Sequence, residues 1–211
     1  MQMIVVDLET SGVDLAKAGI WQIGAVDFEN PPRIFLEEAR IDNEDKVTKE
    51  STQVHGKGEK ELRDRKKQSQ KQLLIRFFKW CEKSKIKNFA CQNPQFDVAF
   101  LEIKARKYGL KLPLNYHAFD LHSIAQTKYL QLKKKFLIIE NRSGMGLSTI
   151  IKFCGLVDER KHLEKGKVVK EGKEHNALED AKLTAECLSR ILKGKNLLKE
   201  YNKFPIPKYL K

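Results

Sequence analysis

Residues 3–12 read MIVVDLETSG, an apolar run with two acidic residues, Asp7 and Glu9, at its end. The run is short and rich in isoleucine and valine, which is typical of a buried β-strand. Side chains two residues apart in a strand project to the same face, so these two carboxylates are predicted to lie side by side. Such a pair is unfavourable unless a cation neutralises it. The alternative is a strand that has already reached solvent, which is the commoner case for an isolated Asp-x-Glu.

Three further strands are predicted after this first run. Residues 20–28 and 33–41 are apolar runs separated by Asn30-Pro31-Pro32, which is a turn signal. Three strands with short links predict an antiparallel meander. Residues 87–91 predict a fourth, shorter strand.

Helical periodicity follows in the rest of the chain. It predicts five helices, at residues 72–83, 94–108, 121–130, 147–153 and 177–192. Asn176 with Glu179 three residues later fits a capping box for the last helix. Residues 56–72 are predicted to be a loop with a short helix, and the lysine-rich residues 158–174 a mobile loop. Strands followed by alternating helices and strands predict an α/β domain around a mixed sheet.

Composition narrows the classes of protein. The chain has 211 residues, and 41 Lys plus Arg against 28 Asp plus Glu give a net charge of +13. The excess predicts a polyanionic partner such as nucleic acid, although a lysine-rich proteome would produce the same figure. No apolar stretch approaches the about 18 residues of a membrane span, and no secretory signal is expected. Four scattered cysteines without a CxxC pair favour reduced thiols in a cytoplasmic protein.

Two more segments carry acidic residues that are candidates for a catalytic or metal-binding role. Asp97 lies in NPQFDVAFL near a predicted helix start, where an acid can simply favour the helix dipole. His175 and Asp180 lie in HNALEDA, and each taken alone fits an ordinary surface residue. Together with Asp7 and Glu9, the set supplies four carboxylates and a histidine from three segments. Such oxygen ligands suit Mg²⁺ or Mn²⁺ rather than zinc, and four can hold two ions for phosphodiester cleavage.

The segments VVDLETSG, NPQFDVAFL and HNALEDA, in this order, resemble the three exonuclease motifs of the DnaQ-like DEDDh 3′–5′ exonucleases. WQIGAVDF, QVHGKGEKEL, FDLHSIA and GLSTIIKFCGL resemble other segments of that family, so the resemblance spans about residues 3–193. It implies an RNase H-like three-layer fold with a central mixed β-sheet flanked by helices. Residues 1–193 would form the exonuclease domain and residues 194–211 a basic C-terminal tail.

The resemblance also implies an activity. Asp7, Glu9, Asp97 and Asp180 would bind two Mg²⁺ ions, with Mn²⁺ as a substitute, and His175 would be the general base for the attacking water. The expected reaction removes nucleoside 5′-monophosphates from the 3′ end of single-stranded DNA or RNA.

Several residues near the motifs are expected to contact that 3′ end. They are Thr10, Gly12, His55, Asn93 and Phe96. Leu8, Trp21 and Phe100 are further candidates, but apolar residues at these spacings usually pack inward. Gln92-Asn93 departs from the His-Asn that is frequent in the family, which leaves the contact at Asn93 open.

Other readings remain open at this point. The fold could serve as a non-catalytic nucleic-acid-binding module, or the chain could be the proofreading subunit of a DNA polymerase, with residues 204–207 as a partner-binding peptide. A frayed, solvated tail is the expected alternative. A homodimer or a polymerase-type partner is equally open, and no membrane partner is expected. The basic segments 63–71 and 161–173 are predicted to hold the strand behind its 3′ end, with binding that weakens as salt is added.

Overall fold

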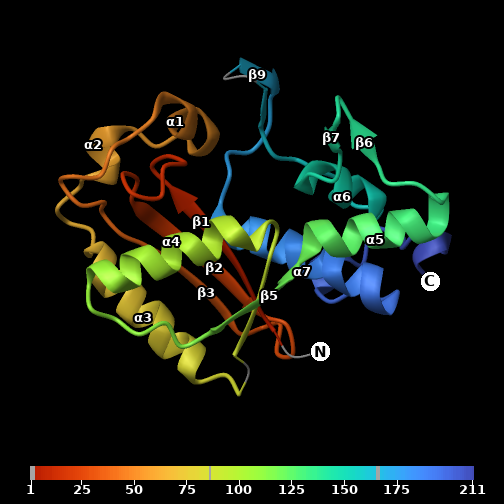
Figure 1. Cartoon of the computed structure of the whole chain (residues 1–211), viewed down its shortest axis with the longest axis horizontal. Coiled ribbons are helices and arrows are strands. Elements are labelled where there is room, and N and C mark those ends of the chain that lie inside the picture. The colour runs from red at the N-terminus through yellow and green to blue at the C-terminus, as the bar shows by residue number, and fades with distance from the viewer. Residues whose placement is uncertain (1–2, 86, 165–166) are drawn as a thin grey trace.

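A five-stranded mixed sheet forms the centre of the molecule in a computed structural model that describes residues 3–85, 87–164 and 167–211 (Figure 1). Its strand order is β3-β2-β1-β4-β5. The bounds are β1 Ile4–Thr10, β2 Ile20–Asp27, β3 Ile34–Glu38, β4 Asn88–Cys91 and β5 Asn115–Asp120. β1, β2 and β3 pair antiparallel, so the predicted meander is confirmed, whereas β4 and β5 run parallel to β1.

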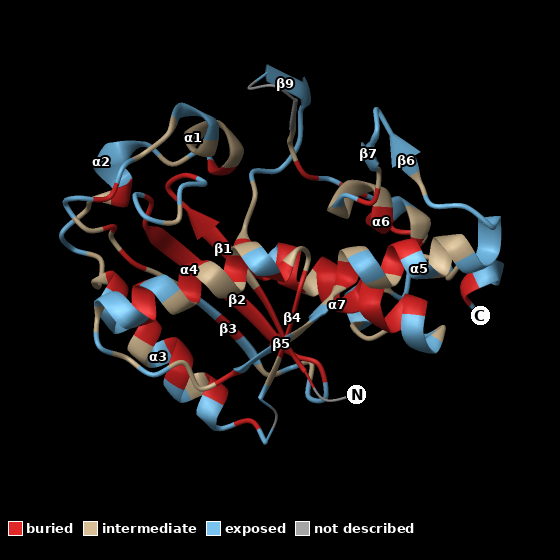
Figure 2. Cartoon of the chain, viewed as in Figure 1, coloured by how far each residue is buried: buried red, intermediate tan, exposed pale blue. Residues whose placement is uncertain are grey.

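Helices cover both faces of this sheet. α3 (Gln70–Glu82) and α4 (Pro94–Lys107) pack on one face, and α5 (Leu121–Lys133), α6 (Leu147–Phe153) and α7 (Ala177–Lys193) on the other. The buried residues follow the sheet and the inward side of α7 (Figure 2). The predicted three layers are therefore confirmed, and the five predicted helices are present with ends shifted by up to three residues.

Alternation along β1 determines which way the first two acids point. Ile4, Val6 and Leu8 belong to the apolar cluster under α3 and α4, and Val5 belongs to the cluster under α7. Asp7 and Glu9 have the same parity as Val5, so they face the α7 side of the sheet. The prediction that these carboxylates share one face is confirmed.

The start of α7 lies directly against the middle of β2. The Gln22 side chain accepts a hydrogen bond from the Ala177 backbone N–H at 2.8 Å. A Cβ atom added at Gly24 would overlap the backbone of Ala177 and Leu178. Glycine is therefore required at position 24 for the helix to approach the sheet this closely.

Several elements differ from the sequence prediction. Residues 158–174, predicted to be a mobile loop, contain an antiparallel pair, β8 (His162–Glu164) and β9 (Lys167–Lys170), so that prediction is wrong; residues 165–166 lie outside the described part of the chain. The hairpin β6 (Ile138–Ile139) with β7 (Arg142–Ser143), the edge strand β5 and helix α1 (Lys49–His55) were not predicted, whereas α2 (Glu59–Leu62) is the short helix predicted within residues 56–72.

The C-terminal tail is docked rather than frayed. It forms two short 3-10 helices, η1 (Lys199–Tyr201) and η2 (Lys208–Leu210), and its apolar side chains, including buried Leu210, pack on the α7 side of the core. The guanidinium of buried Arg190 on α7 donates to the carbonyl oxygens of Tyr201 and Phe204 at 3.1 and 3.0 Å. The expectation of a solvated end is therefore wrong. In the described part of the chain, no helix combines the length and apolar character needed to cross a membrane.

Candidate active site

The four predicted carboxylates converge at one end of the sheet. Asp7 and Glu9 lie on β1, Asp97 in the first turn of α4, and Asp180 in the first turn of α7. The Leu8 backbone N–H donates to Asp97 Oδ1 at 3.1 Å, which fixes α4 against the strand that carries the first two acids. Potential ligand atoms of Glu9, Asp180 and His175 all lie within 4.8 Å of one another.

Burial and mutual repulsion make this cluster hard to ionise. Burial, together with the charges of Asp180, Asp97 and Glu9, raises the pKa of Asp7 well above its ordinary value. Burial and Asp180 raise the pKa of Glu9 to about 8, and burial raises that of Asp97 to about 8. Carboxylates with such pKa values are stabilised in their charged form by a bound cation.

His175 reaches the cluster from the residue before the α7 N-cap. Its Nε2 lies 2.9 Å from the Lys161 carbonyl oxygen, and its Nδ1 lies 3.3 Å from Asp180 Oδ2. Burial lowers the pKa of His175, but the contacts with Asp180 and the Lys161 carbonyl outweigh it and raise the pKa above its ordinary value. Asn176 caps α7 through the N–H groups of Leu178 and Glu179, as predicted. The Glu179 carboxylate instead pairs with Lys182 at 3.0 Å. Among the described residues it makes no hydrogen bond back to the Asn176 backbone, so the reciprocal half of the predicted capping box is absent.

The guanidinium of Arg160 contacts the same carboxylate. Its Nη1 donates to Asp180 Oδ2 at 3.2 Å, and its Nε and Nη2 donate to the two oxygens of Asp158 at 3.0 Å each. Sequence reasoning missed Arg160 and Asp158, because they lie in a lysine-rich run without periodicity or a motif.

The donor set fits a divalent cation. Asp180 Oδ2 is occupied by Arg160 and His175, whereas Asp180 Oδ1 is buried and has no hydrogen-bond partner among the described residues. A buried carboxylate oxygen without a partner is unfavourable, and a metal ion would satisfy it. Oxygen ligands in this number are typical of hard cations.

The comparisons with known proteins agree with this geometry. Residues 4–188 match the RNase_T family model, which is described as an exonuclease. The chain belongs to this family of DnaQ-like DEDDh exonucleases. These exonucleases use divalent metal ions. A search of curated proteins found no match for the chain.

Solved structures confirm the RNase H-like fold of this exonuclease chain. The nuclease domain of 3′hExo, a DEDDh family member solved with rAMP, aligns with a TM-score of 0.61 at 16% identity, over 93% of this chain and 94% of that one. E. coli Exonuclease I with a dA13 oligonucleotide gives 0.67 at 15% identity, over 92% of this chain and 41% of that one. Cell-death related nuclease 4 aligns with a TM-score of 0.64 at 16% identity, over 92% of this chain and 64% of that one.

Three of the expected substrate contacts lie beside the β1 end of the cluster. Thr10 Oγ1 donates to the Gly12 carbonyl at 2.7 Å, which closes the turn after Glu9. His55 ends α1, and the preceding Val54 carbonyl accepts the backbone N–H of His175 at 3.3 Å. Burial lowers the pKa of His55 to about 4, so its ring is neutral.

The orientation of the His55 ring leaves one donor unused. Nδ1 accepts the Lys57 backbone N–H at 3.0 Å, so the hydrogen is on Nε2. Nε2 is buried and has no partner within the described residues. Trp21 packs edge-on against this ring with 5.0 Å between the ring centroids and is fully buried. It is therefore a core residue, which was the alternative to a substrate contact.

Asn93 and Phe96 lie at the α4 side of the cluster. Asn93 has φ of 66°, a left-handed conformation that asparagine tolerates, and its N–H donates to Asp120 Oδ1 at 3.2 Å. Phe96 is half-buried and packs on Phe100 with 4.8 Å between ring centroids. Leu8 and Phe100 are buried core residues.

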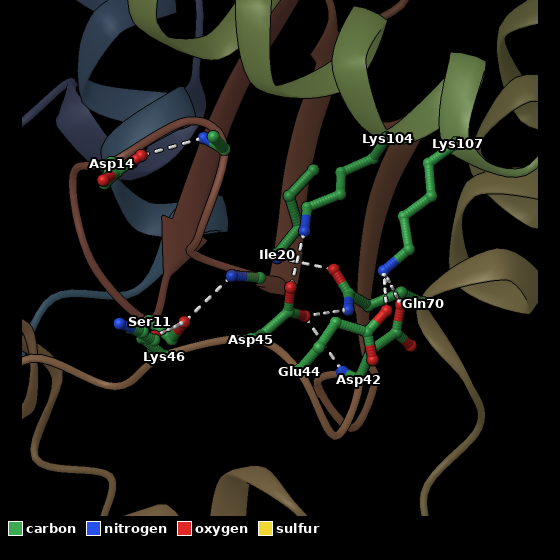
Figure 3. A network of polar contacts seen from close by, with 12 residues as sticks. Ser11, Asp14, Ile20, Asp42, Glu44, Asp45, Lys46, Gln70, Lys104 and Lys107 are labelled. Carbon is green, nitrogen blue, oxygen red and sulfur yellow. Dashed lines mark hydrogen bonds and ion pairs between the residues drawn. The ribbon is translucent and has the colours of Figure 1, made fainter.

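A buried polar network holds these two sides of the exonuclease site together (Figure 3). Lys104 on α4 pairs with Asp45 at 2.8 Å, and both side chains are 3% exposed. The Gln70 side chain at the start of α3 donates to Asp45 and accepts the Ile20 N–H at 2.8 Å. Because Ile20 pairs with Thr10 across the sheet, the network fixes the turn after Glu9 relative to α4.

The basic segments include many cations that serve internal contacts. Arg63 donates to the carbonyl oxygens of Asp42 and Asp45 at 2.8 and 2.7 Å. Lys67 pairs with Glu38 at 2.6 Å. In the segment 161–173, of which residues 165–166 lie outside the described part, Lys170 donates to the Asp158 carbonyl and Lys173 pairs with Glu159.

Proposed function

We propose that this chain is a metal-dependent 3′–5′ exonuclease that releases nucleoside 5′-monophosphates from single-stranded nucleic acid. The observation that carries the proposal is the cluster of Asp7, Glu9, Asp97 and Asp180 with His175 beside Glu9 and Asp180, in which Asp180 Oδ1 lacks a partner among the described residues. Asp7, Glu9 and Asp180 would hold one Mg²⁺ or Mn²⁺ ion, and Asp7 with Asp97 a second.

The chain's own residues define the proton transfer. Bound ions would supply the positive charge that favours ionisation of water and stabilises the leaving 3′ oxygen. The Lys161 carbonyl holds the hydrogen of His175 on Nε2, so Nδ1 is the atom that accepts the proton of the attacking water. We expect Nδ1, which now faces Asp180, to be released when that carboxylate binds a cation.

The substrate class is supported by the neighbours and by the residues around the cluster. The 3′hExo domain binds rAMP and Exonuclease I binds a DNA oligonucleotide. The unused Nε2–H of His55 offers a donor to an acceptor oxygen of a terminal nucleotide. We propose Thr10, Gly12, Asn93 and Phe96 as its other contacts.

Labelled substrates test the direction and the metal requirement together. A 3′-labelled strand should release labelled mononucleotide at once, whereas a 5′-labelled strand should shorten progressively, and EDTA should stop both. Asp7→Ala should reduce the rate to background with an unchanged circular dichroism spectrum, because it removes a shared ligand. Glu102→Ala, on α4 with a side chain 40% exposed, is the control and should keep full activity. Retained activity of Asp7→Ala, or initial release from the 5′ end, would refute the proposal.

The role of His175 is tested separately. His175→Ala should lower the single-turnover rate by about 10² to 10⁴, the usual contribution of a general base. Mn²⁺ affinity, measured by titration calorimetry, should stay within a few-fold of wild type. A variant that loses Mn²⁺ affinity instead would make His175 a metal ligand.

A further inference from the structure

Arg160 is a buried arginine that connects the cluster to a second carboxylate. It is 8% exposed, and its guanidinium forms a two-pronged contact with Asp158, whose side chain is fully buried. The third nitrogen reaches Asp180 Oδ2 at 3.2 Å, while Nη2 also donates to Ser148 Oγ at 3.2 Å. Every prong of the guanidinium therefore has a protein acceptor.

The base of the β8–β9 hairpin holds Arg160 in this position. The Lys161 N–H donates to the Lys173 carbonyl at 2.7 Å, and the Lys173 N–H donates to the Glu159 carbonyl at 2.8 Å. The Lys161 carbonyl in turn contacts His175 Nε2. The same backbone pairing thus brings the Arg160 and His175 side chains to one oxygen of Asp180.

We propose that Arg160 is a positioning residue for the metal centre, which holds Asp180 Oδ2 so that Oδ1 faces the place of a cation. This inference rests on the proposed function, since it concerns a ligand of the proposed metal site. Two observations carry it: Oδ2 is bound by Arg160, and Oδ1 is buried without a partner among the described residues. Groups that orient a metal ligand by hydrogen bonding commonly change metal affinity by 10- to 100-fold when they are removed.

Removal of Arg160 would have two opposing effects on a cation. The loss of one positive charge would attract the ion more strongly, whereas the loss of orientation would let the Asp180 carboxylate rotate. Orientation dominates here, because the contact with Asp158 and Ser148 prevents the guanidinium from following Asp180. Arginine supplies this fork and lysine does not.

Mn²⁺ binding to the full chain, followed by electron paramagnetic resonance without substrate, tests the inference. Arg160→Met should weaken Mn²⁺ binding about 10- to 100-fold. Arg160→Lys, which keeps the charge but not the fork, should weaken it at least several-fold. Activity lost in either variant should recover as Mn²⁺ is raised, which a merely misfolded protein would not show. Arg106→Met makes the same substitution at a side chain 79% exposed on α4 and should bind Mn²⁺ like wild type.

The fold of the variants is controlled independently. Arg160→Met leaves the Asp158 carboxylate buried without its arginine partner, with His162 Nε2 3.0 Å from its Oδ2, so the double variant Asp158→Asn/Arg160→Met restores the charge balance. If the single variant unfolds by circular dichroism, the double variant and Arg160→Lys give the result. Unchanged or tighter Mn²⁺ binding in the folded variants would overturn the positioning role. Absence of Mn²⁺ binding to wild type would instead refute the proposed function, together with the inference that rests on it.

Discussion

At the scale of single residues, the cluster places more negative charge in a buried site than the neighbouring cations offset. Asp7, Glu9 and Asp97 all have raised pKa values, the last two about 8, although Arg160 and His175 lie nearby. A folded protein with such groups retains protons that its unfolded chain has already released. Stability and metal content are therefore coupled at this site.

This coupling predicts how stability depends on pH. The unfolded chain ionises Glu9 near 4.5 and Asp97 near 3.8, whereas the folded chain does so only near 8. The free energy of unfolding of the metal-free protein should therefore fall as pH rises from about 4 to about 8. Saturating Mg²⁺ or Mn²⁺ should restore it by about 2.7 kcal/mol at a hundredfold excess over Kd. Denaturant titrations in EDTA and in metal measure both effects.

A pair of matched variants separates the effect of the acidic cluster from the effect of removing any one carboxylate from the protein. Asp7→Asn removes one carboxylate of the cluster, so it should flatten the pH dependence and abolish the stabilisation by metal. Glu102→Gln, on α4 with a side chain 40% exposed, should leave both curves unchanged. A metal-free stability that rises steadily between pH 5 and 8 would contradict the prediction.

The sequence indicated five of the site residues because their types and order follow a motif. Asp7 and Glu9 could even be placed on one face from strand periodicity alone. Arg160 could not be predicted, since its position depends on backbone pairing between residues 160 and 173 in a segment without apolar periodicity. The partnerless oxygen of Asp180 is likewise a property of the folded geometry.

At the scale of elements, α7 carries the site at one end and the docked tail at the other. Arg190 and Glu186 are fully buried and pair at 2.8 Å. The second Glu186 oxygen accepts the N–H groups of Leu197 and Leu198 at 2.9 and 3.0 Å. The pair therefore connects the helix to the backbone of the tail.

Breaking this pair should destabilise the fold without altering the site. Arg190→Met leaves a buried carboxylate unpaired, which costs about 3–5 kcal/mol. Denaturant unfolding measures the loss, and limited proteolysis should show faster cleavage within residues 194–211. Arg106→Met is the surface control, within about 0.5 kcal/mol of wild type. An Arg190→Met protein as stable as wild type would show that the tail contributes little.

Elements with one buried face were predictable, and exposed elements were not. α7 and α3 each place an apolar stripe against the sheet, which produces helical periodicity in the sequence. β5 is an edge strand whose side chains are mostly exposed, and β9 is exposed throughout, so neither has an alternating apolar pattern. Backbone pairing alone defines them.

At the scale of the whole molecule, the net charge of +13 comes from lysines and arginines of two kinds. Structural cations make internal contacts, and available cations have exposed side chains. Arg63 and Lys67 hold the loop and strand beside them, so they belong to the first group. Arg65, Lys66 and Lys71 in the same segment have exposed side chains and belong to the second. The available group is the one that can contact phosphates.

Binding of single-stranded nucleic acid should therefore depend steeply on salt. Fluorescence anisotropy with the Asp7→Ala chain in EDTA avoids degradation of the probe. With three or more phosphates contacted, the slope of log K against log salt should be about −2 or steeper. A slope near zero would assign the lysines to solubility alone.

Charge variants locate the contacts. Replacing Arg65, Lys66 and Lys71 by glutamine should reduce the slope by up to about 2. The same charge change in the tail, at Lys195, Lys199 and Lys208, is the matched control and should leave the slope near wild type. Equal effects of the two triples would indicate unspecific attraction.

Gly24 would affect which cation the site holds, although it is not one of the ligands. Since α7 contacts the sheet through backbone atoms at this residue, the separation between Asp180 and the β1 carboxylates is set by van der Waals contact with a residue that has no side chain. Mg²⁺ requires oxygens at about 2.0–2.1 Å in a nearly ideal octahedron, whereas Ca²⁺ accepts 2.3–2.6 Å and irregular shells. Any side chain at position 24 would widen the gap, so we expect Gly24→Ala to shift the site toward larger cations through a residue that touches no ion.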